Sequence, residues 1–352
     1  MAEALRRLGA EVQVLTLARG GFYEARLGAA GLNPLCMGEC SNRIVRLATM
    51  ARLLLKNRPH VIQAGHTYMN AYAAVLGRIC RAISIGAVRT NVANMFALHN
   101  KLVVRLLMST TALITNSDRT RAGLIRAGLV LAERVYVVPN AIEESNRVES
   151  ALDRNATAEE VRVLFLGRLI PGKRVDRFLQ ALSLARRARP QLVGLIAGDG
   201  PERRRAEQLA RNLGLNASQA TFLGHVEDPQ RLLARVDLLV LTSDDIEGSP
   251  NAILEGMAAG IPVITTACGN AASLIQDGDS GFVCSFDATA LAEKMVLLSG
   301  SSDLRKRMGE ASRRRAIVCH GSEQLGVRLL DVYRAVARTR DDTHVTGLLE
   351  CA

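Results

Sequence analysis

The sequence predicts an α/β protein with two domains, each built on a parallel sheet covered by helices. First, 352 residues are too many for one ordinary hydrophobic core and suit two. Second, short apolar runs such as Val161–Leu166 and Leu192–Ala197 have the length of buried strands, and helical segments follow them. Third, 48% apolar and 22% charged residues are typical of a globular chain.

Charge and cysteine content exclude several classes of protein. The formal net charge of +11 indicates anionic partners, although an Arg-rich codon usage is an alternative origin. Nucleotide phosphates or an acidic membrane face fit better than nucleic acid, because the arginines are spread over many helices and aromatic residues are only 3%. The seven cysteines include no C-x2-C pair, so reduced cytoplasmic thiols are expected rather than zinc or disulfides. The chain has neither a run of about 18 apolar residues nor a signal-peptide core, so a cytoplasmic protein is expected.

The N-terminal half begins inside a helix, Met1–Leu8, and continues with alternating strands and helices. Strands are predicted at Glu11–Leu17, Pro59–Ala64, Ile83–Arg89, Ala112–Asn116 and Val135–Val138. Helices are predicted around Lys101–Met108 and from Asp118, where Asn116 and Ser117 form the cap.

An amphipathic helix is predicted at Arg43–Arg58, with leucines on one face and many basic residues. One interpretation is that this helix lies on an anionic membrane surface. The other is that its leucine face packs on the sheet and water solvates its charges.

The polar segment 143–160 has no apolar period and predicts a linker, and the C-terminal half follows it. The first helices of that half are predicted at Val175–Arg187 and Glu202–Leu213. Its further strands are predicted at Ala220–Leu223, Val236–Leu241 and Pro262–Thr266. The later helices are predicted at Asn251–Ala259, Ala288–Leu298, Asp303–Ala316 and Glu323–Arg338.

Loops at the carboxyl ends of these strands have the residue types of an anion site. Gly167, Arg168 and Lys173 follow the strand Val161–Leu166, where Arg offers paired donors and Lys a point charge. Gly198–Pro201 (GDGP) follows the next strand, and its glycines allow a backbone to approach a ligand. Glu247–Asn251 lies between a strand and the start of a helix, where open α/β sheets bind phosphates.

These motifs carry a resemblance to one family. The segment E-G-S-P-N-A-I-L-E followed by G-M-A-A-G-I-P-V-I resembles the E-x7-E region of retaining nucleotide-sugar glycosyltransferases of family four, the "group 1" family with a GT-B fold. Gly167–Arg174 is similar to the family's G-R-L-x-x-x-K-G, with Lys173-Arg174 in place of the K-G pair. Val135–Glu143 is similar to V-x-V-I-P-N-G-I-D, and G-D-G-P is also shared.

The resemblance implies two Rossmann-like domains that face each other across a cleft. The implied boundaries are an incomplete acceptor-side domain at 1–142, a linker at 143–160, a nucleotide-sugar domain at 161–322, and a helix at 323–338 that crosses back. The family's first strand and Gly-rich loop do not precede Met1–Leu8, so an N-terminal truncation is expected.

The resemblance also implies roles for individual residues. Donor contacts are expected from Gly167, Arg168, Lys173, Gly198, Gly200, His225, Val226, Glu247, Ser249, Pro250, Asn251 and Glu255. Catalytic roles are expected for His66, Glu247, Arg168 and Lys173, and acceptor contacts for His66, Asn70 and Arg89. No cofactor and no metal are expected, because basic residues neutralise the phosphates and Asp277–Asp279 reads as an Asp-Gly turn.

The implied activity is transfer of a sugar from a nucleotide-diphosphate sugar to a saccharide or lipid-linked acceptor, with retention of configuration. Such enzymes act in polysaccharide and lipopolysaccharide biosynthesis for the cell envelope. The alternative is an impaired or inactive nucleotide-binding homologue that lacks the N-terminal Gly-rich loop. A nicotinamide-linked dehydrogenase is disfavoured because no G-x-G-x-x-G opens a βαβ unit.

Overall fold

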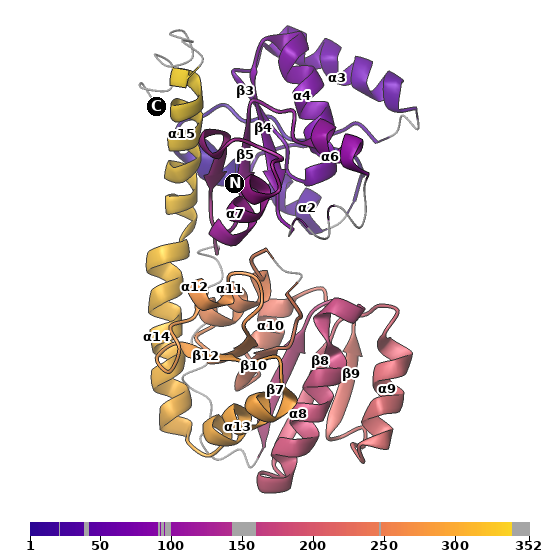
Figure 1. The fold of residues 1–352 in the computed structure, drawn as a ribbon, viewed down its shortest axis with the longest axis vertical. Coiled ribbons are helices and arrows are strands. Elements are labelled where there is room, and N and C mark those ends of the chain that lie inside the picture. The colour runs from indigo at the N-terminus through magenta and orange to yellow at the C-terminus, as the bar shows by residue number, and fades with distance from the viewer. Residues whose placement is uncertain are drawn as a thin grey trace. The chain divides into compact units, whose positions relative to one another are not determined.

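The computed structural model describes residues 1–20, 22–38, 42–90, 92, 95, 100–142, 160–245 and 248–339. The chain divides into two compact units (Figure 1). One consists of Met1–Pro139 together with the helix Ser322–Thr339, and the other of Asn140–Gly321. Each unit contains a parallel sheet with helices, which confirms the predicted α/β class.

The second unit has a six-stranded sheet with the order β12-β11-β10-β7-β8-β9, and all of its pairings are parallel. The strands are β7 (Val161–Leu166), β8 (Leu192–Ala197), β9 (Ala220–Gly224), β10 (Leu238–Leu241), β11 (Val263–Thr266) and β12 (Gly281–Cys284). The chain winds outward from β7 in one direction and from β10 in the other. The boundary between β7 and β10 is therefore a topological switch point, where such sheets bind ligands.

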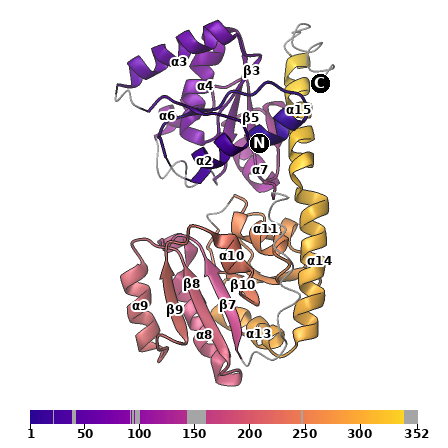
Figure 2. The same cartoon turned by 180° about the vertical axis from the view of Figure 1, so that it is seen from behind.

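Helices cover both faces of this sheet. They are α8 (Val175–Ala188), α9 (Arg203–Asn212), α10 (Pro229–Leu233), α11 (Asn251–Ala258), α12 (Ala271–Leu274), α13 (Ala288–Ser299) and α14 (Ser302–His320). Figure 2 shows α9 beside β9 at one edge of the sheet.

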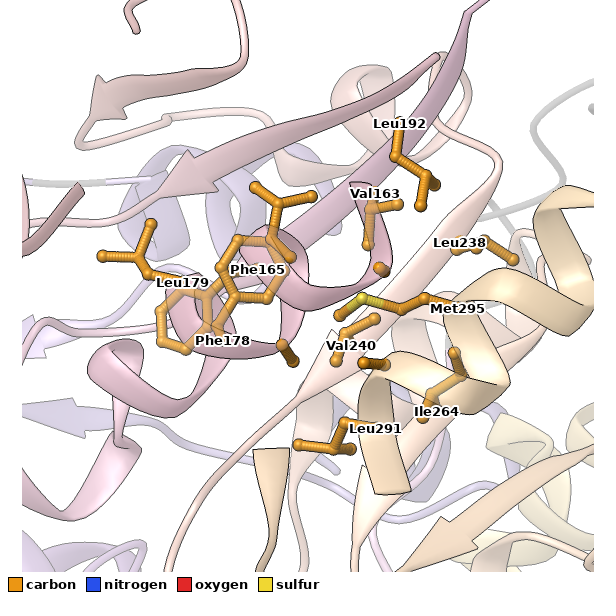
Figure 3. Close-up of a cluster of buried hydrophobic side chains, with 14 of the residues drawn as sticks. Val163, Phe165, Phe178, Leu179, Leu192, Leu238, Val240, Ile264, Leu291 and Met295 are labelled. Atoms are coloured by element: carbon orange, nitrogen blue, oxygen red, sulfur yellow. The ribbon is translucent and has the colours of Figure 1, made fainter. Parts of the chain in front are cut away.

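The core of the second unit has one layer on each face of the sheet. Val163 and Phe165 of β7 pack with Phe178 of α8 in the first layer (Figure 3). Leu164 points to the opposite face and packs in the second layer with Met257 of α11. Because successive side chains of a strand alternate between faces, a strand buried on both faces becomes a continuous apolar run.

The first unit has a four-stranded parallel sheet with the order β3-β4-β5-β6 and a separate two-stranded sheet, β1-β2. The strands are β1 (Leu15–Thr16), β2 (Leu35–Cys36), β3 (Val61–Gln63), β4 (Ile83–Val88), β5 (Ala112–Thr115) and β6 (Val135–Val137). The helices are α1 (Ala2–Arg7), α2 (Phe22–Ala29), α3 (Arg43–Asn57), α4 (Asn70–Cys80), α6 (Lys101–Leu107), α7 (Asp118–Arg126) and α15 (Ser322–Thr339).

Within the first unit, helix α15 packs closely on α1 and makes a polar contact with β3. The buried hydroxyl of Tyr333 donates to Oε1 of Gln63 at the end of β3. A Cβ placed on Gly326 would lie 3.1 Å from the carbonyl oxygen of Ala4, so glycine lets α15 approach α1. No helix among the described ranges combines the length and the hydropathy that a membrane span requires.

Several predicted boundaries differ from the structure. The strand predicted at Glu11–Leu17 is confined to β1, because only Leu15 and Thr16 pair with a neighbouring strand, at Leu35 and Cys36. Helices α2 and α4 and strand β12 are not among the predicted elements. Helix α14 ends at His320, whereas the predicted end was Ala316. Nδ1 of His320 lies 3.0 Å from the carbonyl oxygen of Asn140.

Candidate functional site

The carboxyl edge of the six-stranded sheet brings three predicted loops together. The loop after β7 contains Gly167–Arg174, the loop after β8 contains Gly198–Pro201, and the loop after β10 leads from Thr242 toward Pro250. Strands β7 and β10 are neighbours, with Val163 opposite Leu238. The first and third loops therefore start side by side at the switch point.

Backbone and hydroxyl contacts join the loop after β7 to the loop after β10. The amide of Asp244 donates to the carbonyl oxygen of Gly172 at 2.9 Å. The hydroxyl of Thr242 lies 3.0 Å from the carbonyl oxygen of Lys173 and 2.7 Å from that of Arg174. Thr242 is fully buried, so these contacts are shielded from water.

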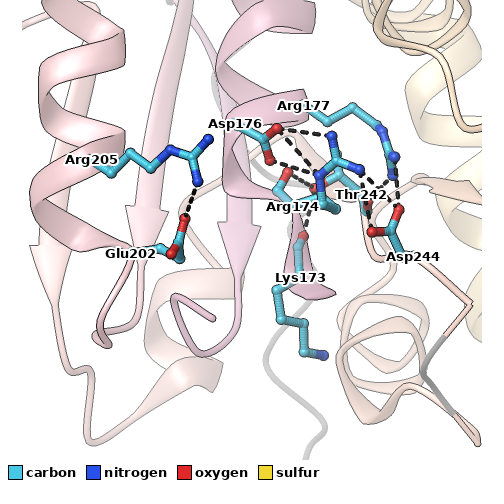
Figure 4. A network of polar contacts seen from close by, with 8 residues as sticks. All are labelled: Lys173, Arg174, Asp176, Arg177, Glu202, Arg205, Thr242 and Asp244. Carbon is cyan, nitrogen blue, oxygen red and sulfur yellow. Dashed lines mark hydrogen bonds and ion pairs between the residues drawn. The ribbon is translucent and has the colours of Figure 1, made fainter. Parts of the chain in front are cut away.

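A charged network adds to this connection (Figure 4). Nε of Arg174 donates to Oδ1 of Asp176 at 3.0 Å, and its Nη1 donates to Oδ1 of Asp244 at 3.2 Å. Arg177 also reaches Asp244, with Nη2 at 2.8 Å from Oδ1, while its Nη1 donates to the carbonyl oxygen of Thr242 at 2.5 Å. The Asp244 carboxylate therefore accepts hydrogen bonds from two guanidinium groups, those of Arg174 and Arg177.

The network shifts the ionisation of its members. The hydrogen bond to Asp176 is the largest cause that raises the pKa of Arg174 above its usual range, and Asp244 adds to it. Burial alone would raise the pKa of Asp176, but the hydrogen bond and the charge of Arg174 outweigh burial and lower the pKa below its usual range. Both groups are thus charged at neutral pH.

Arg168 and Lys173 carry the positive charge that lies outside this network. The Arg168 side chain is exposed and has no hydrogen-bond or ion-pair partner within the described part of the chain. Figure 4 shows the Lys173 side chain extending away from the network. The Lys173 stem lies beside Gly167, where an added Cβ would be 3.7 Å from Cδ. These two cations are suited to an anionic ligand.

The two glycines of the G-D-G-P loop allow backbones to touch. A Cβ on Gly198 would lie 1.9 Å from the carbonyl oxygen of Gly167, and one on Gly200 would lie 2.4 Å from that of Leu169. The amide of Leu169 donates to the carbonyl oxygen of Asp199 at 2.9 Å. Glycine is therefore needed here for contact between the loops after β7 and β8. The approach of this backbone to a ligand stays a prediction.

The start of helix α11 forms the other side of the candidate site. Pro250 occupies the N-cap position and Asn251 is the first helical residue. Ser249 is buried, and its Oγ has no hydrogen-bond partner among the residues that the structure describes. Nδ2 of Asn140 holds this segment, since it donates to the carbonyl oxygen of Ser249 at 3.3 Å and to Oδ1 of Asn251 at 2.6 Å.

Of the two predicted acidic residues of this segment, the structure describes only Glu255. Glu255 lies in the second turn of α11 and is half-buried. Glu247 lies outside the described residues, so its predicted contact with the transferred sugar stays a prediction.

Two of the predicted donor-contact residues, His225 and Val226, follow β9. His225 is exposed, and Val226 packs against the core of the second unit. The amide of Gly198 donates to the carbonyl oxygen of Gly224 at 2.7 Å, so the end of β9 meets the G-D-G-P loop. The loops after β7, β8 and β9 therefore form one continuous series of backbone contacts.

The predicted acceptor-side residues lie in the first unit. His66 is exposed before the 3-10 turn Thr67–Met69, with its ring centroid 5.6 Å from that of Tyr68. Arg89 follows β4, and burial lowers its pKa. Asn70 is fully buried and is bonded to Ala87, with Oδ1 2.8 Å from the amide and Nδ2 3.3 Å from the carbonyl oxygen. In this structure Asn70 fastens α4 to β4.

Sequence reasoning missed Arg174, Asp244 and Asn140. The departure of Lys173-Arg174 from the K-G pair was a signal for Arg174. Asn140 and Asp244 act through partners distant in sequence, and no local pattern marks them. In the described ranges no three His, Cys, Asp or Glu side chains cluster as a metal would require.

Comparison with known families identifies the chain. The family described as "Glycosyltransferase Family 4" matches residues 1–146, and "Glycosyl transferases group 1" matches residues 149–315. The chain therefore belongs to the group 1 glycosyltransferases of family four. Its two parallel sheets resemble GT-B structures, such as Anabaena HepE in complex with UDP and glucose, with a TM-score of 0.78, 18% identity and 94% of each chain covered.

Curated relatives share parts of the sequence. N-acetyl-alpha-D-glucosaminyl L-malate synthase of Bacillus anthracis is 34% identical over 41% of this chain and 38% of its own length. Alpha-D-kanosaminyltransferase of Streptomyces kanamyceticus is 29% identical over 64% of this chain and 60% of its own length. Lipopolysaccharide core biosynthesis glycosyltransferase LpsE of Rhizobium meliloti is 29% identical over 46% of each. The chain thus spans less than two thirds of the length of these relatives.

Proposed function

We propose that this protein is a retaining glycosyltransferase that moves a sugar from a nucleotide-diphosphate donor to a saccharide or lipid-linked acceptor. One observation carries the proposal. The Arg168 and Lys173 loop and the loop that leads to the N-terminus of α11 start from neighbouring strands at a switch point and are bonded to each other. Cations, a helix N-terminus and a switch point are the features that bind a diphosphate in open α/β sheets.

The proposed donor roles follow from the chemistry of each group. Arg168 and Lys173 bind the diphosphate, and the first turn of α11 adds its backbone amides and dipole. Glu255 accepts hydrogen bonds from the ribose hydroxyls, and Glu247 contacts the transferred sugar. The loop of His225 and Val226 receives the nucleobase. A solved HepE structure holds UDP-glucose, which supports a donor of this chemical class.

The proposed reaction has no covalent intermediate with the protein. The acceptor hydroxyl attacks the anomeric carbon on the face from which the diphosphate leaves, and a diphosphate oxygen takes the proton. The protein mainly stabilises the negative charge that develops on the leaving group. Preorganised donors do this without reorganisation, and each is typically worth about 10²–10³ in rate. His66 and Arg89 are proposed to orient the acceptor.

Helix α3 supports a peripheral membrane contact, which would suit a lipid-linked acceptor at the cytoplasmic face. Its exposed side chains include Ile44, Val45 and Leu55, which are 78%, 50% and 50% exposed. Arg52 and Lys56 are also exposed, and the helix contains no acidic residue. Apolar side chains beside basic ones fit the surface of an anionic bilayer. Polysaccharide or lipopolysaccharide assembly for the cell envelope is the proposed context.

The donor proposal is tested with a panel of UDP-, GDP- and ADP-sugars, by calorimetry for binding and by nucleotide release for turnover. Glu255→Ala should raise the KM for the donor strongly while the protein still folds, because the change removes the proposed acceptor for the ribose hydroxyls. Glu293→Ala on the exposed face of α13 is the matched control.

Two other outcomes would decide against parts of this proposal. Nucleoside diphosphate binding without turnover would favour the nucleotide-binding homologue that does not catalyse transfer. Equal kinetics for Glu255→Ala and Glu293→Ala would remove Glu255 from the donor site.

A further inference from the structure

Arg174 has a backbone conformation that is unusual for its residue type. It lies in the left-handed region, with φ 52° and ψ 51°, at the position before helix α8. The family segment that resembles Gly167–Arg174 has glycine at this place, which adopts such angles without steric cost. A large charged residue is therefore present where the backbone favours glycine.

The guanidinium group of Arg174 contacts two carboxylates. Nε and Nη2 contact Asp176 in the first turn of α8, at 3.0 and 2.9 Å. Nη1 contacts both carboxylate oxygens of Asp244 after β10, at 3.2 and 3.3 Å. All three guanidinium nitrogens of Arg174 are thus bonded to carboxylates. The Arg174 side chain therefore connects the first turn of α8 to the loop after β10.

The charges of the network balance. Arg174 and Arg177 are matched by Asp176 and Asp244, so the four residues together add no net charge. The network itself therefore offers no net charge to an anion. Arg174 is therefore placed to fix geometry rather than to bind phosphate directly, although it is adjacent to a proposed phosphate ligand.

We propose that Arg174 is a positioning residue for the donor diphosphate, which holds the loop of Lys173 against the loop after β10. The carbonyl oxygens of Lys173 and Arg174 accept from Thr242, and the carbonyl of Gly172 accepts from Asp244. The bridge keeps these contacts formed before the ligand arrives. The identity of the ligand rests on the proposed function, whereas the bridge itself does not.

Preorganisation should favour ligands that reach Lys173. In the proposed function, the second phosphate of a nucleoside diphosphate binds at that loop, and a nucleoside monophosphate lacks this phosphate. Loss of the bridge should therefore weaken diphosphate binding by on the order of tenfold, the size of a typical coupling between neighbouring groups, and leave monophosphate binding nearly unchanged. A general loss of stability would weaken both.

The experiment compares Arg174→Gly, Arg174→Lys and a control, Arg205→Gln, in the full chain. Arg205 is 80% exposed and pairs only with Glu202 among the described residues, so its change removes one charge away from the bridge (Figure 4). Calorimetry with UDP, GDP and ADP and with the matching monophosphates gives the two affinities. Hydrogen exchange of segments 170–174 and 242–245 reports the bridge without ligand.

The expected result is a lower diphosphate-to-monophosphate selectivity and faster exchange of both segments in Arg174→Gly, with Arg205→Gln like wild type. Arg174→Lys should behave like Arg174→Gly, because one ammonium cannot span two carboxylates as a guanidinium does. Wild-type affinity and exchange in Arg174→Gly, or full function in Arg174→Lys, would overturn the proposal. If wild type binds no nucleoside diphosphate, the donor function fails, and the exchange of the two segments still decides whether Arg174 forms the bridge.

Discussion

Lys173 and Arg174 are adjacent cations with different environments. Three nitrogens of Arg174 are bonded to carboxylates, whereas the Lys173 side chain extends away from them (Figure 4). Arg168 is exposed on the same loop. Positive charge at a site has catalytic value only where it is not already neutralised by a neighbouring carboxylate. Among the described residues the exposed Arg168 meets this condition, and the Lys173 side chain, which extends away from the network, is proposed to act with it.

Removing either of these cations should slow turnover far more than it affects folding. Lys173→Ala and Arg168→Ala are each expected to lower kcat by about 10²–10³, because each deletes one preorganised partner of the leaving diphosphate. The thermal midpoint should stay near that of wild type, since neither side chain fills a core cluster. Steady-state kinetics with the donor found in the panel measures the effect.

Arg204→Ala is the matched control, because Arg204 is an exposed arginine on α9. A kcat within twofold of wild type for both Lys173→Ala and Arg168→Ala would show that neither stabilises the transition state.

The sequence predicts the residues proposed to bind the ligand better than it predicts the side chains that hold those residues in place. Gly167, Arg168 and Lys173 lie on a loop after a strand, as their order along the chain indicates. The side chains that fix this loop come from distant positions, since Asp244 is 70 residues from Arg174. Asn140 likewise meets Asn251 across 111 residues. The periodicity of apolar residues predicts local structure, but it does not predict which loops contact each other in the folded chain.

At the level of elements, prediction succeeds where burial is simple. Strands β7 and β8 have the bounds that the apolar runs predict, because a central parallel strand is covered on both faces. Helix α4 was not predicted, because it is covered on most sides and shows no polar stripe. Gly77 within it allows close approach to Ser84, where an added Cβ would lie 2.7 Å from the Ser84 Cβ.

The contact between the loops after β7 and β8 depends on Gly198. Gly198→Ala should lower the thermal midpoint and weaken nucleotide binding, because the new Cβ would overlap the carbonyl oxygen of Gly167 at a φ of +140°. The backbone of the cation-bearing loop must then shift. Thermal denaturation and nucleoside diphosphate calorimetry measure the two effects.

Gly214→Ala separates steric overlap from backbone strain. Gly214 has a φ of +75° in the same unit, and nothing lies within 4 Å of an added Cβ. Its change should cost about 1–2 kcal/mol of stability, the penalty of a left-handed residue, and leave binding intact. Equal stability losses in the two variants, with unchanged nucleotide affinity, would show that the loop contact does not support the site.

At the scale of the whole molecule, the formal charge of +11 belongs to the first unit, because basic and acidic residues are equal in number in Asn140–Gly321. Part of it lies near apolar side chains on helix α3. The buried residues of that helix are Met50, Ala51 and Leu54, and Ile44 and Leu55 of the same helix are exposed. Core packing thus explains one face of the helix and leaves the other face to water or to a partner.

We expect the exposed face of α3 to bind anionic bilayers. The double change Arg52→Glu and Lys56→Glu should strongly reduce cosedimentation with vesicles that contain phosphatidylserine, since each basic residue near such a surface contributes about 1 kcal/mol. Ile44→Asp should also reduce binding, because it removes an apolar side chain that is 78% exposed. Leu131→Asp is the matched control, since Leu131 is 61% exposed outside this helix. Binding that persists in the α3 variants, or equal binding to neutral vesicles, would show that the charge of α3 does not bind anionic bilayers and serves solubility alone.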